Sequence, residues 1–206
     1  MSTIINTKQK TNIFDAKGIA QIGVLTAIAT VLMLFEFPLW FAPGFYKIDL
    51  SDVPILIGSF AIGPLAGLIM EFIKNLLNLM INGTTTGGIG ELSNFVIGCA
   101  LVLPSAVIYK QQKTKKGAVI GLITGTVCLI LAGCLLNAYV LLPVYAKVFH
   151  MPMDALVAMG TAINPNIKSL SALIILAVAP FNLLKGVLAS VLTLLIYKKV
   201  SPILHK

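Results

Sequence analysis

Residues 40–82 read WFAPGFYKIDLSDVPILIGSFAIGPLAGLIMEFIKNLLNLMIN, and the rest of the chain is organised around them. It begins as a loop, becomes apolar at Val53, breaks at Gly63-Pro64 and continues as a second apolar run. The second run carries polar residues that, at about 100° per residue, share one narrow helical face. A polar stripe on an otherwise apolar membrane helix must face protein or a cavity rather than lipid. The stripe consists of Glu71, Lys74, Asn75, Asn78 and Asn82.

The composition places the whole chain in a membrane. Of its 206 residues, 58% are hydrophobic and 11% are charged, whereas soluble domains have about 25% charged residues. All 15 basic residues are Lys, and most of them flank the apolar runs, which is typical of cytoplasmic anchoring rather than nucleic-acid binding. We expect one transmembrane domain over residues 1–206, in which residues 1–17 form a cytoplasmic arm and not a cleavable signal peptide.

The placement of Lys predicts how the chain crosses the bilayer. Clear apolar spans cover residues 18–37, 92–109, 117–145 and 170–197. Lys residues near both termini and within residues 110–116 mark the cytoplasmic side. Because the first span leaves the cytoplasm and the second returns to it, the residues between them must cross an even number of times.

Residues 53–82 must make that even number of crossings, although they are few for two full-length helices at about 1.5 Å per residue. Two short helices broken at Gly63-Pro64 would suffice, and a re-entrant hairpin is the alternative. We expect an all-α integral membrane protein with six transmembrane helices, cytoplasmic termini, and short or broken helices 2 and 3. An outward-facing pocket would then be formed by the loops at residues 40–51, 82–90 and 146–168.

Lys185 and Asn182 lie one turn apart in the last span and share a face. A Lys buried in a membrane needs a partner. Lys185 therefore either forms a structural ion pair, with Glu71 or Glu91 as the expected partner, or donates to a ligand. The sequence leaves both possibilities open.

Further amides and aromatic residues are expected near the same pocket. Asn94 and Asn137 lie towards the outer ends of their spans, and Trp40, Phe45 and Tyr46 lie in the first outer loop. Amides favour a neutral, hydrogen-bonding ligand, and the aromatic side chains could stack on a flat ring. Each aromatic residue alone also fits an interfacial belt at the membrane surface.

Catalytic and metal-binding motifs have little support. The sequence contains no H-E-x-x-H, Walker A or G-x-S-x-G motif, so any uphill transport would need energy from a partner. Asp49 and Asp52 could hold a metal in a small membrane enzyme of lipid or prenyl metabolism, but two ligands make a poor site. Helix capping by Ser51 and Asp52 is the other possibility. We expect no enzyme and no metal site; a facilitator that works without partners is a further alternative.

Small residues recur along the first span at Ala20, Gly23 and Ala27. Their spacing places them on one face, where they would allow another helix to approach closely. That helix could belong to the protein's own bundle or to another subunit.

Several motifs together resemble one transporter family over nearly the whole chain. They are KIDLSDVP at residues 47–54, Gly58, Gly63-Pro64, EFIKN at residues 71–75, GELSNF at residues 90–95 and PFNLLK at residues 180–185. The combination resembles the riboflavin-specific substrate-binding (S) components of energy-coupling factor (ECF) vitamin transporters.

The resemblance implies a six-helix subunit of the bacterial cell membrane that captures riboflavin from outside with high affinity and needs no cofactor. It implies partners that supply energy, namely a transmembrane coupling subunit and two cytoplasmic ATPase subunits. The small face at Ala20, Gly23 and Ala27 would dock to these partners. The residues implied to contact the vitamin are Pro43, Gly44, Phe45, Tyr46, Lys47, Asn137, Asn182 and Lys185. Asn94 is expected beside them because it lies near the same pocket.

Overall fold

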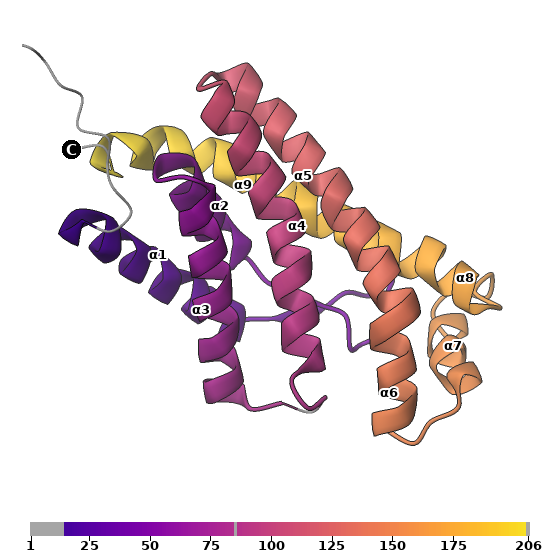
Figure 1. Cartoon of the computed structure of the whole chain (residues 1–206). Helices are drawn as coiled ribbons and strands as arrows, with labels where there is room; N and C mark the ends of the chain where they lie inside the picture. The colour runs from indigo at the N-terminus through magenta and orange to yellow at the C-terminus, as the bar shows by residue number, and fades with distance from the viewer. Residues whose placement is uncertain (1–14, 85, 205–206) are drawn as a thin grey trace, which may run out of the picture.

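The structure is a computed structural model that describes residues 15–84 and 86–204, so most of the predicted N-terminal arm lies outside the described residues. Helices make up nearly all of the described chain (Figure 1). They are α1 (Ala16–Leu34), α2 (Asp52–Ala61), α3 (Pro64–Asn82), α4 (Ile89–Gln111), α5 (Lys115–Leu136), α6 (Leu142–Val148), α7 (Met153–Thr161), α8 (Leu170–Leu173) and α9 (Ala179–Leu204). Two π-helical segments, η1 (Asn137–Leu141) and η2 (Ile174–Val178), join α5 to α6 and α8 to α9.

The membrane-spanning helices agree only in part with the prediction of six spans. Among the described residues, five helical segments are long and apolar enough to cross a membrane, and they are Ala16–Leu34, Pro64–Asn82, Ile89–Gln111, Lys115–Val148 and Leu170–Val200. The remaining apolar helix, α2, has 10 residues. At about 1.5 Å per residue it is roughly 15 Å long, half the thickness of a hydrocarbon core.

The break between α2 and α3 lies where the sequence predicts it. Gly63 has a φ of 137°, a backbone conformation that favours glycine, and Pro64 occupies the first turn of α3. The prediction of a short helix 3 is wrong, because the available residues are divided unequally. The 19 residues of α3 form a full-length span, and only α2 is short.

A two-residue antiparallel ladder lies outside the helices, between β1 (Phe37–Pro38) and β2 (Lys47–Ile48). The sequence did not predict it, because two residues are too few to show an alternating pattern. Phe37 pairs with Ile48, which draws the two ends of the intervening loop together. The ladder therefore fixes where the predicted outer loop leaves and re-enters the bundle.

Close packing between α4 and α5 forms the centre of the bundle. At Gly121, an added Cβ would lie 2.6 Å from the backbone oxygen of Ser105, so only glycine permits this approach of the two helices. Figure 1 shows α4 and α5 side by side with α9 crossing behind them. The α3–α4 loop and α6 lie at one end of these helices, and the α4–α5 loop lies at the other (Figure 1).

Candidate binding site

A cavity of about 210 Å³ opens at the end of the bundle that carries the β1–β2 loop. Its walls come from the loop, the last turns of α1 and α3, the first turn of α4, and the segments around η1 and the start of α9. Its lining is rich in polar and aromatic groups. The polar residues are Glu36, Lys47, Asp49, Asn78, Glu91, Asn94, Asn137, Asn182 and Lys185, and the aromatic residues are Phe45, Tyr46, Tyr145 and Phe181.

The structure brings most of the predicted contact residues to this one cavity. The residues that line it are Phe45, Tyr46, Lys47, Asn94, Asn137, Asn182 and Lys185. Pro43 and Gly44 do not. Pro43 is buried, and its backbone oxygen accepts a hydrogen bond of 2.8 Å from the backbone nitrogen of Tyr46, so it shapes the turn that holds Tyr46. Trp40 is 87% exposed and lies away from the cavity.

Tyr46 and Asn137 form one wall by bonding to each other. The Tyr46 hydroxyl donates to Oδ1 of Asn137 over 2.7 Å, and Nδ2 of Asn137 donates to the backbone oxygen of Gly133 over 2.8 Å. Burial raises the pKa of Tyr46, so the hydroxyl remains a donor at neutral pH. The Tyr46 ring also packs against Phe45 and Phe181, with centroids 4.5 and 5.5 Å away.

Asn182 lies on the α9 side of the cavity, and only the nitrogen of its amide forms a hydrogen bond with the described residues. Nδ2 donates to the backbone oxygen of Val178 over 2.9 Å, and Oδ1 accepts no hydrogen bond from the described residues. Gly133 makes room for this side chain, because an added Cβ there would lie 2.6 Å from Nδ2. The amide is thereby held in place with its oxygen available to the cavity.

Lys185 is held by two carboxylates at the bottom of the cavity. Its Nζ lies 3.4 Å from Oδ2 of Asp52 and 3.7 Å from Oδ2 of Asp49. The prediction that Glu71 or Glu91 would be its ion-pair partner is therefore wrong. Glu71 is occupied by Lys74, and Glu91 accepts from the Thr84 hydroxyl over 3.1 Å.

Lys74 belongs to the same charge cluster, which consists of Asp49, Asp52, Glu71, Lys74 and Lys185, but it does not line the cavity. Its Nζ lies 2.9 Å from Oδ1 of Asp52 and 2.9 Å from Oε2 of Glu71, and its side chain is fully buried. Asp52 therefore bridges Lys74 and Lys185. A shared carboxylate of this kind couples the fully buried cation to the one that lines the cavity.

The two possible roles considered for Asp52, helix cap and metal ligand, do not fit its surroundings. Ser51 holds the N-cap position of α2 without a side-chain hydrogen bond to the helix, and it is Asp49 that accepts from the Ser51 backbone nitrogen, over 2.7 Å. The Asp52 carboxylate faces two ammonium groups instead. Among the described residues no cluster of three or more His, Cys, Asp or Glu could hold a metal ion.

The polar stripe of α3 faces protein as predicted along its inner part. Glu71, Lys74 and Asn75 are buried. Asn75 accepts from Nδ2 of Asn94 over 3.2 Å, which orients the Asn94 amide at the edge of the cavity. Asn78, the next residue of the stripe, lines the cavity itself, and Asn82 is exposed.

Several lining residues were not predicted from the sequence to face the cavity, among them Glu36, Glu91, Tyr145 and Phe181. Glu36 could have been predicted, since it is a charged residue at the outer end of the first span. In the structure it forms an ion pair with Lys47. Tyr145 offers no such signal, because its place depends on the π-helical segment before it. Its ring meets Phe45 edge-on, with centroids 5.6 Å apart.

The small residues of α1 lie on its outer face. Ala20, Gly23 and Ala27 are all exposed, and an added Cβ at Gly23 would meet nothing within 4 Å. The opposite face of α1, which includes Ile22 and Leu25, packs into the core. The possibility that the small face packs within the protein's own bundle is therefore wrong.

Comparison with known proteins agrees with this architecture. The family model described as "ECF transporter, substrate-specific component" matches residues 17–197. A Staphylococcus aureus (strain TCH60) protein named riboflavin transporter RibU is 32% identical over 98% of this chain and 100% of its own length. A Bacillus subtilis (strain 168) protein named riboflavin transporter FmnP is 35% identical over 90% of this chain and 93% of its own length.

A solved structure described as the S component of a bacterial ECF transporter has the same fold. It superposes with a TM-score of 0.71 at 32% identity, covering 91% of this chain and 97% of its own. The family match spans far more than half of the chain, and the chain is a multi-pass membrane protein rather than an enzyme. It belongs to the family of substrate-specific components of ECF transporters.

Proposed function

We propose that this chain is the high-affinity riboflavin-binding subunit of an ECF-type ABC transporter and that the cavity at the β1–β2 loop holds the vitamin. The observation that carries the proposal is the lining of the cavity, which combines aromatic rings with amides and a single deeply buried Lys. Riboflavin has a flat aromatic ring with carbonyl groups and a polyhydroxyl tail. Aromatic surfaces suit the ring, and amide and ammonium donors suit the oxygens.

The charges around the cavity favour the uncharged vitamin over its phosphorylated forms. Three carboxylates, Glu36, Asp49 and Glu91, line the cavity beside two ammonium groups, Lys47 and Lys185. Lys47 is paired with Glu36 and Lys185 is loosely paired with Asp49, so carboxylates offset both positive charges. A phosphate would need several unpaired cationic donors, so we expect riboflavin to bind far more tightly than its phosphate ester.

Purification of the chain tests this function directly. We expect detergent-solubilised protein to carry a bound flavin with visible absorbance, and the flavin-depleted protein to quench riboflavin fluorescence with a one-to-one end point. The phosphate ester serves as the matched competitor, since it shares the ring. Protein that shows neither bound flavin nor quenching by riboflavin would refute the assignment.

The proposed topology has six membrane crossings in one domain, residues 1–206, with both termini in the cytoplasm and α2 as a short second crossing. It rests on the distribution of Lys. Labelling of His150→Cys in intact cells, in a background without Cys99, Cys128 and Cys134, tests it, since His150 is exposed beyond α6. Labelling only after permeabilisation would overturn the topology.

The proposed partners are a transmembrane coupling subunit and two cytoplasmic ATPase subunits of the ECF type. The chain itself has no nucleotide-binding motif, and the exposed small face of α1 suits close approach by another helix. We expect Ala27→Trp to prevent co-purification with the coupling subunit and to leave riboflavin binding unchanged. Ile28→Trp is the control, since Ile28 is 46% exposed and points about 100° away. Normal assembly of Ala27→Trp would exclude this face.

A further inference from the structure

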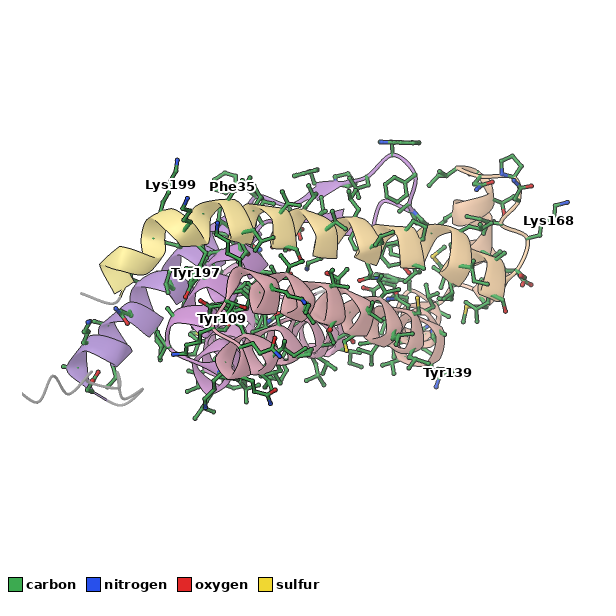
Figure 2. All side chains as sticks on the ribbon, turned by 90° about the horizontal axis from the view of Figure 1, so that it is seen from above. Phe35, Tyr109, Tyr139, Lys168, Tyr197 and Lys199 are labelled. Atoms are coloured by element: carbon green, nitrogen blue, oxygen red, sulfur yellow. The ribbon has the colours of Figure 1, made fainter. Side chains whose placement is uncertain are left out.

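A second cavity, of about 550 Å³, lies at the opposite end of the molecule, between the α4–α5 loop and the last turns of α9. Figure 2 shows two of its residues, Tyr109 and Tyr197, close together beside α9, while Lys199 projects from the outer side of the helix. The hydroxyl of Tyr109 donates to that of Tyr197 over 3.3 Å. This cavity shares no residue with the proposed vitamin site.

The rim of the second cavity is cationic. Lys113, Lys115 and Lys198 all line it and all are exposed. No carboxylate is among the described residues that line the cavity, so no acidic group in that lining neutralises them. Three ammonium groups around one hollow favour an anion, and the tyrosine hydroxyls add hydrogen-bonding groups.

The wall of the cavity is apolar and continues onto the surface that faces lipid. Val119 and Leu194 both line it, and they are 41% and 38% exposed. Both belong to helices that are long and apolar enough to span a membrane. A cationic rim above an apolar, lipid-facing wall matches an amphiphile better than a soluble anion.

A hydroxyl buried in the wall of the cavity has no hydrogen-bond partner among the described residues. Thr193 lines the cavity with 0% exposure, and its Oγ1 forms no hydrogen bond with any described residue. Buried hydroxyl groups without partners are uncommon because leaving one unpaired is costly. An ester or phosphate oxygen of a bound molecule would supply the missing acceptor.

We propose that this cavity binds one anionic glycerophospholipid, with its phosphate between the three Lys residues and an acyl chain along the apolar wall. The lipid would join the α4–α5 loop to the end of α9, beside the tyrosine pair that connects the last turn of α4 to α9. The site lies at the Lys-rich end of the molecule, where an anionic leaflet surface would supply the lipid. The proposal does not depend on which vitamin the chain binds.

Retention of phosphatidylglycerol by the purified protein in neutral detergent tests the proposal, since detergent removes the general attraction of a charged bilayer. Native mass spectrometry would count the bound lipid during titration with phosphatidylglycerol or phosphatidylcholine. We expect one phosphatidylglycerol to bind preferentially. Neutralising Lys113, Lys115 and Lys198 together, each to Gln, should weaken its binding roughly a hundredfold, because each Lys near anionic lipid contributes roughly fivefold.

A matched triple substitution separates a site from general charge effects. Lys110→Gln, Lys116→Gln and Lys199→Gln remove the same charge from the same end of the chain, outside the cavity. We expect this control to bind phosphatidylglycerol as the unsubstituted protein does. Equal losses in the two triple variants, or no loss in either, would overturn the proposal, as would equal retention of phosphatidylcholine.

Two further measurements keep the test decisive. Thr193→Val, which replaces the unpartnered hydroxyl with a methyl group, should weaken phosphatidylglycerol binding a few-fold without altering the elution volume of the protein. Glycerol 3-phosphate should neither raise the melting temperature nor displace the lipid at equal concentration. If it did either as well as phosphatidylglycerol, the cavity would be a soluble-anion site and the lipid proposal would be wrong.

Discussion

Lys74 and Lys185 are both buried in apolar helices and both contact Asp52, yet their surroundings differ. Lys74 lies 2.9 Å from each of two carboxylates and is fully enclosed. Lys185 faces the cavity, and its two carboxylate contacts, at 3.4 and 3.7 Å, are too long for strong hydrogen bonds. The first cation is satisfied within the protein, and the second keeps donor capacity for a ligand.

This difference separates a structural charge from a binding charge within one cluster. A fully buried cation is stable only when its partners neutralise it at short range. A cation that is only loosely paired can exchange a distant carboxylate for a ligand oxygen at little cost. The cluster therefore needs Lys74 for folding, whereas we propose that it presents Lys185 for binding.

The largest expected effect is that of Lys74→Met on folding. Removing this cation leaves Asp52 and Glu71 buried beside each other with less compensating charge. Breaking a buried ion pair in this way costs about 3–5 kcal/mol. We expect a sharp fall in melting temperature and yield, measured on ligand-free protein in detergent, and no such fall in the control Leu76→Met on the exposed face of α3. A normal melting curve for Lys74→Met would contradict a structural role.

A smaller loss of stability is expected from Gly98→Ala, which crowds the same cluster without removing a charge. The added Cβ would lie 2.7 Å from Oε2 of Glu71, and overpacking of this kind costs about 1–3 kcal/mol. Gly23→Ala is the matched control, because its Cβ would meet nothing within 4 Å and Ala favours a helix. Melting curves of the two variants should move in opposite directions, and equal shifts would show that Glu71 is free to move.

Asn182→Ala should affect binding and leave folding nearly unchanged. The substitution removes the amide oxygen that is available to the cavity, and losing one such hydrogen bond costs about 1–2 kcal/mol, or roughly five- to thirtyfold in affinity. Riboflavin fluorescence quenching would measure it, with the exposed amide variant Asn166→Ala as control. An unchanged affinity for Asn182→Ala would remove this residue from the proposed site.

Lys47 provides an exposed counterpart to the two buried lysines, and removing its charge should change stability little. Its ion pair with Glu36 leaves the two side chains 44% and 38% exposed. Such pairs contribute about 0–1 kcal/mol, so Lys47→Gln should shift the melting temperature of ligand-free protein less than Gly98→Ala does. A larger shift for Lys47→Gln would mean that burial does not determine how much each of these lysines contributes to stability.

Much of the fold and part of the candidate site could be predicted from local sequence patterns. The break at Gly63-Pro64 follows from backbone chemistry, and the buried stripe of α3 follows from helical periodicity. Lys185 and Asn182 stand out because polar residues are costly in an apolar span. Each of these signals lies within a few consecutive residues, so one sequence is enough to show it.

Features that depend on contacts between distant segments could not be predicted in this way. The partners of Lys185 are Asp49 and Asp52, which come from a loop and a helix start far away in the chain. The sequence instead favoured Glu71 or Glu91, because any carboxylate near the membrane is an equal candidate until the helices are packed. The lengths of α2 and α3 and the β1–β2 pair were likewise decided by packing.

Lys185→Met distinguishes a binding cation from a structural one, since it makes the same substitution as Lys74→Met at the other end of the cluster. Riboflavin titration by fluorescence quenching would be measured beside the melting curve of the ligand-free variant. We expect an affinity roughly tenfold to a hundredfold weaker and a melting temperature within about 4 °C of the unsubstituted protein. Normal affinity together with early melting would contradict this expectation, and would make Lys185 a second structural charge like Lys74.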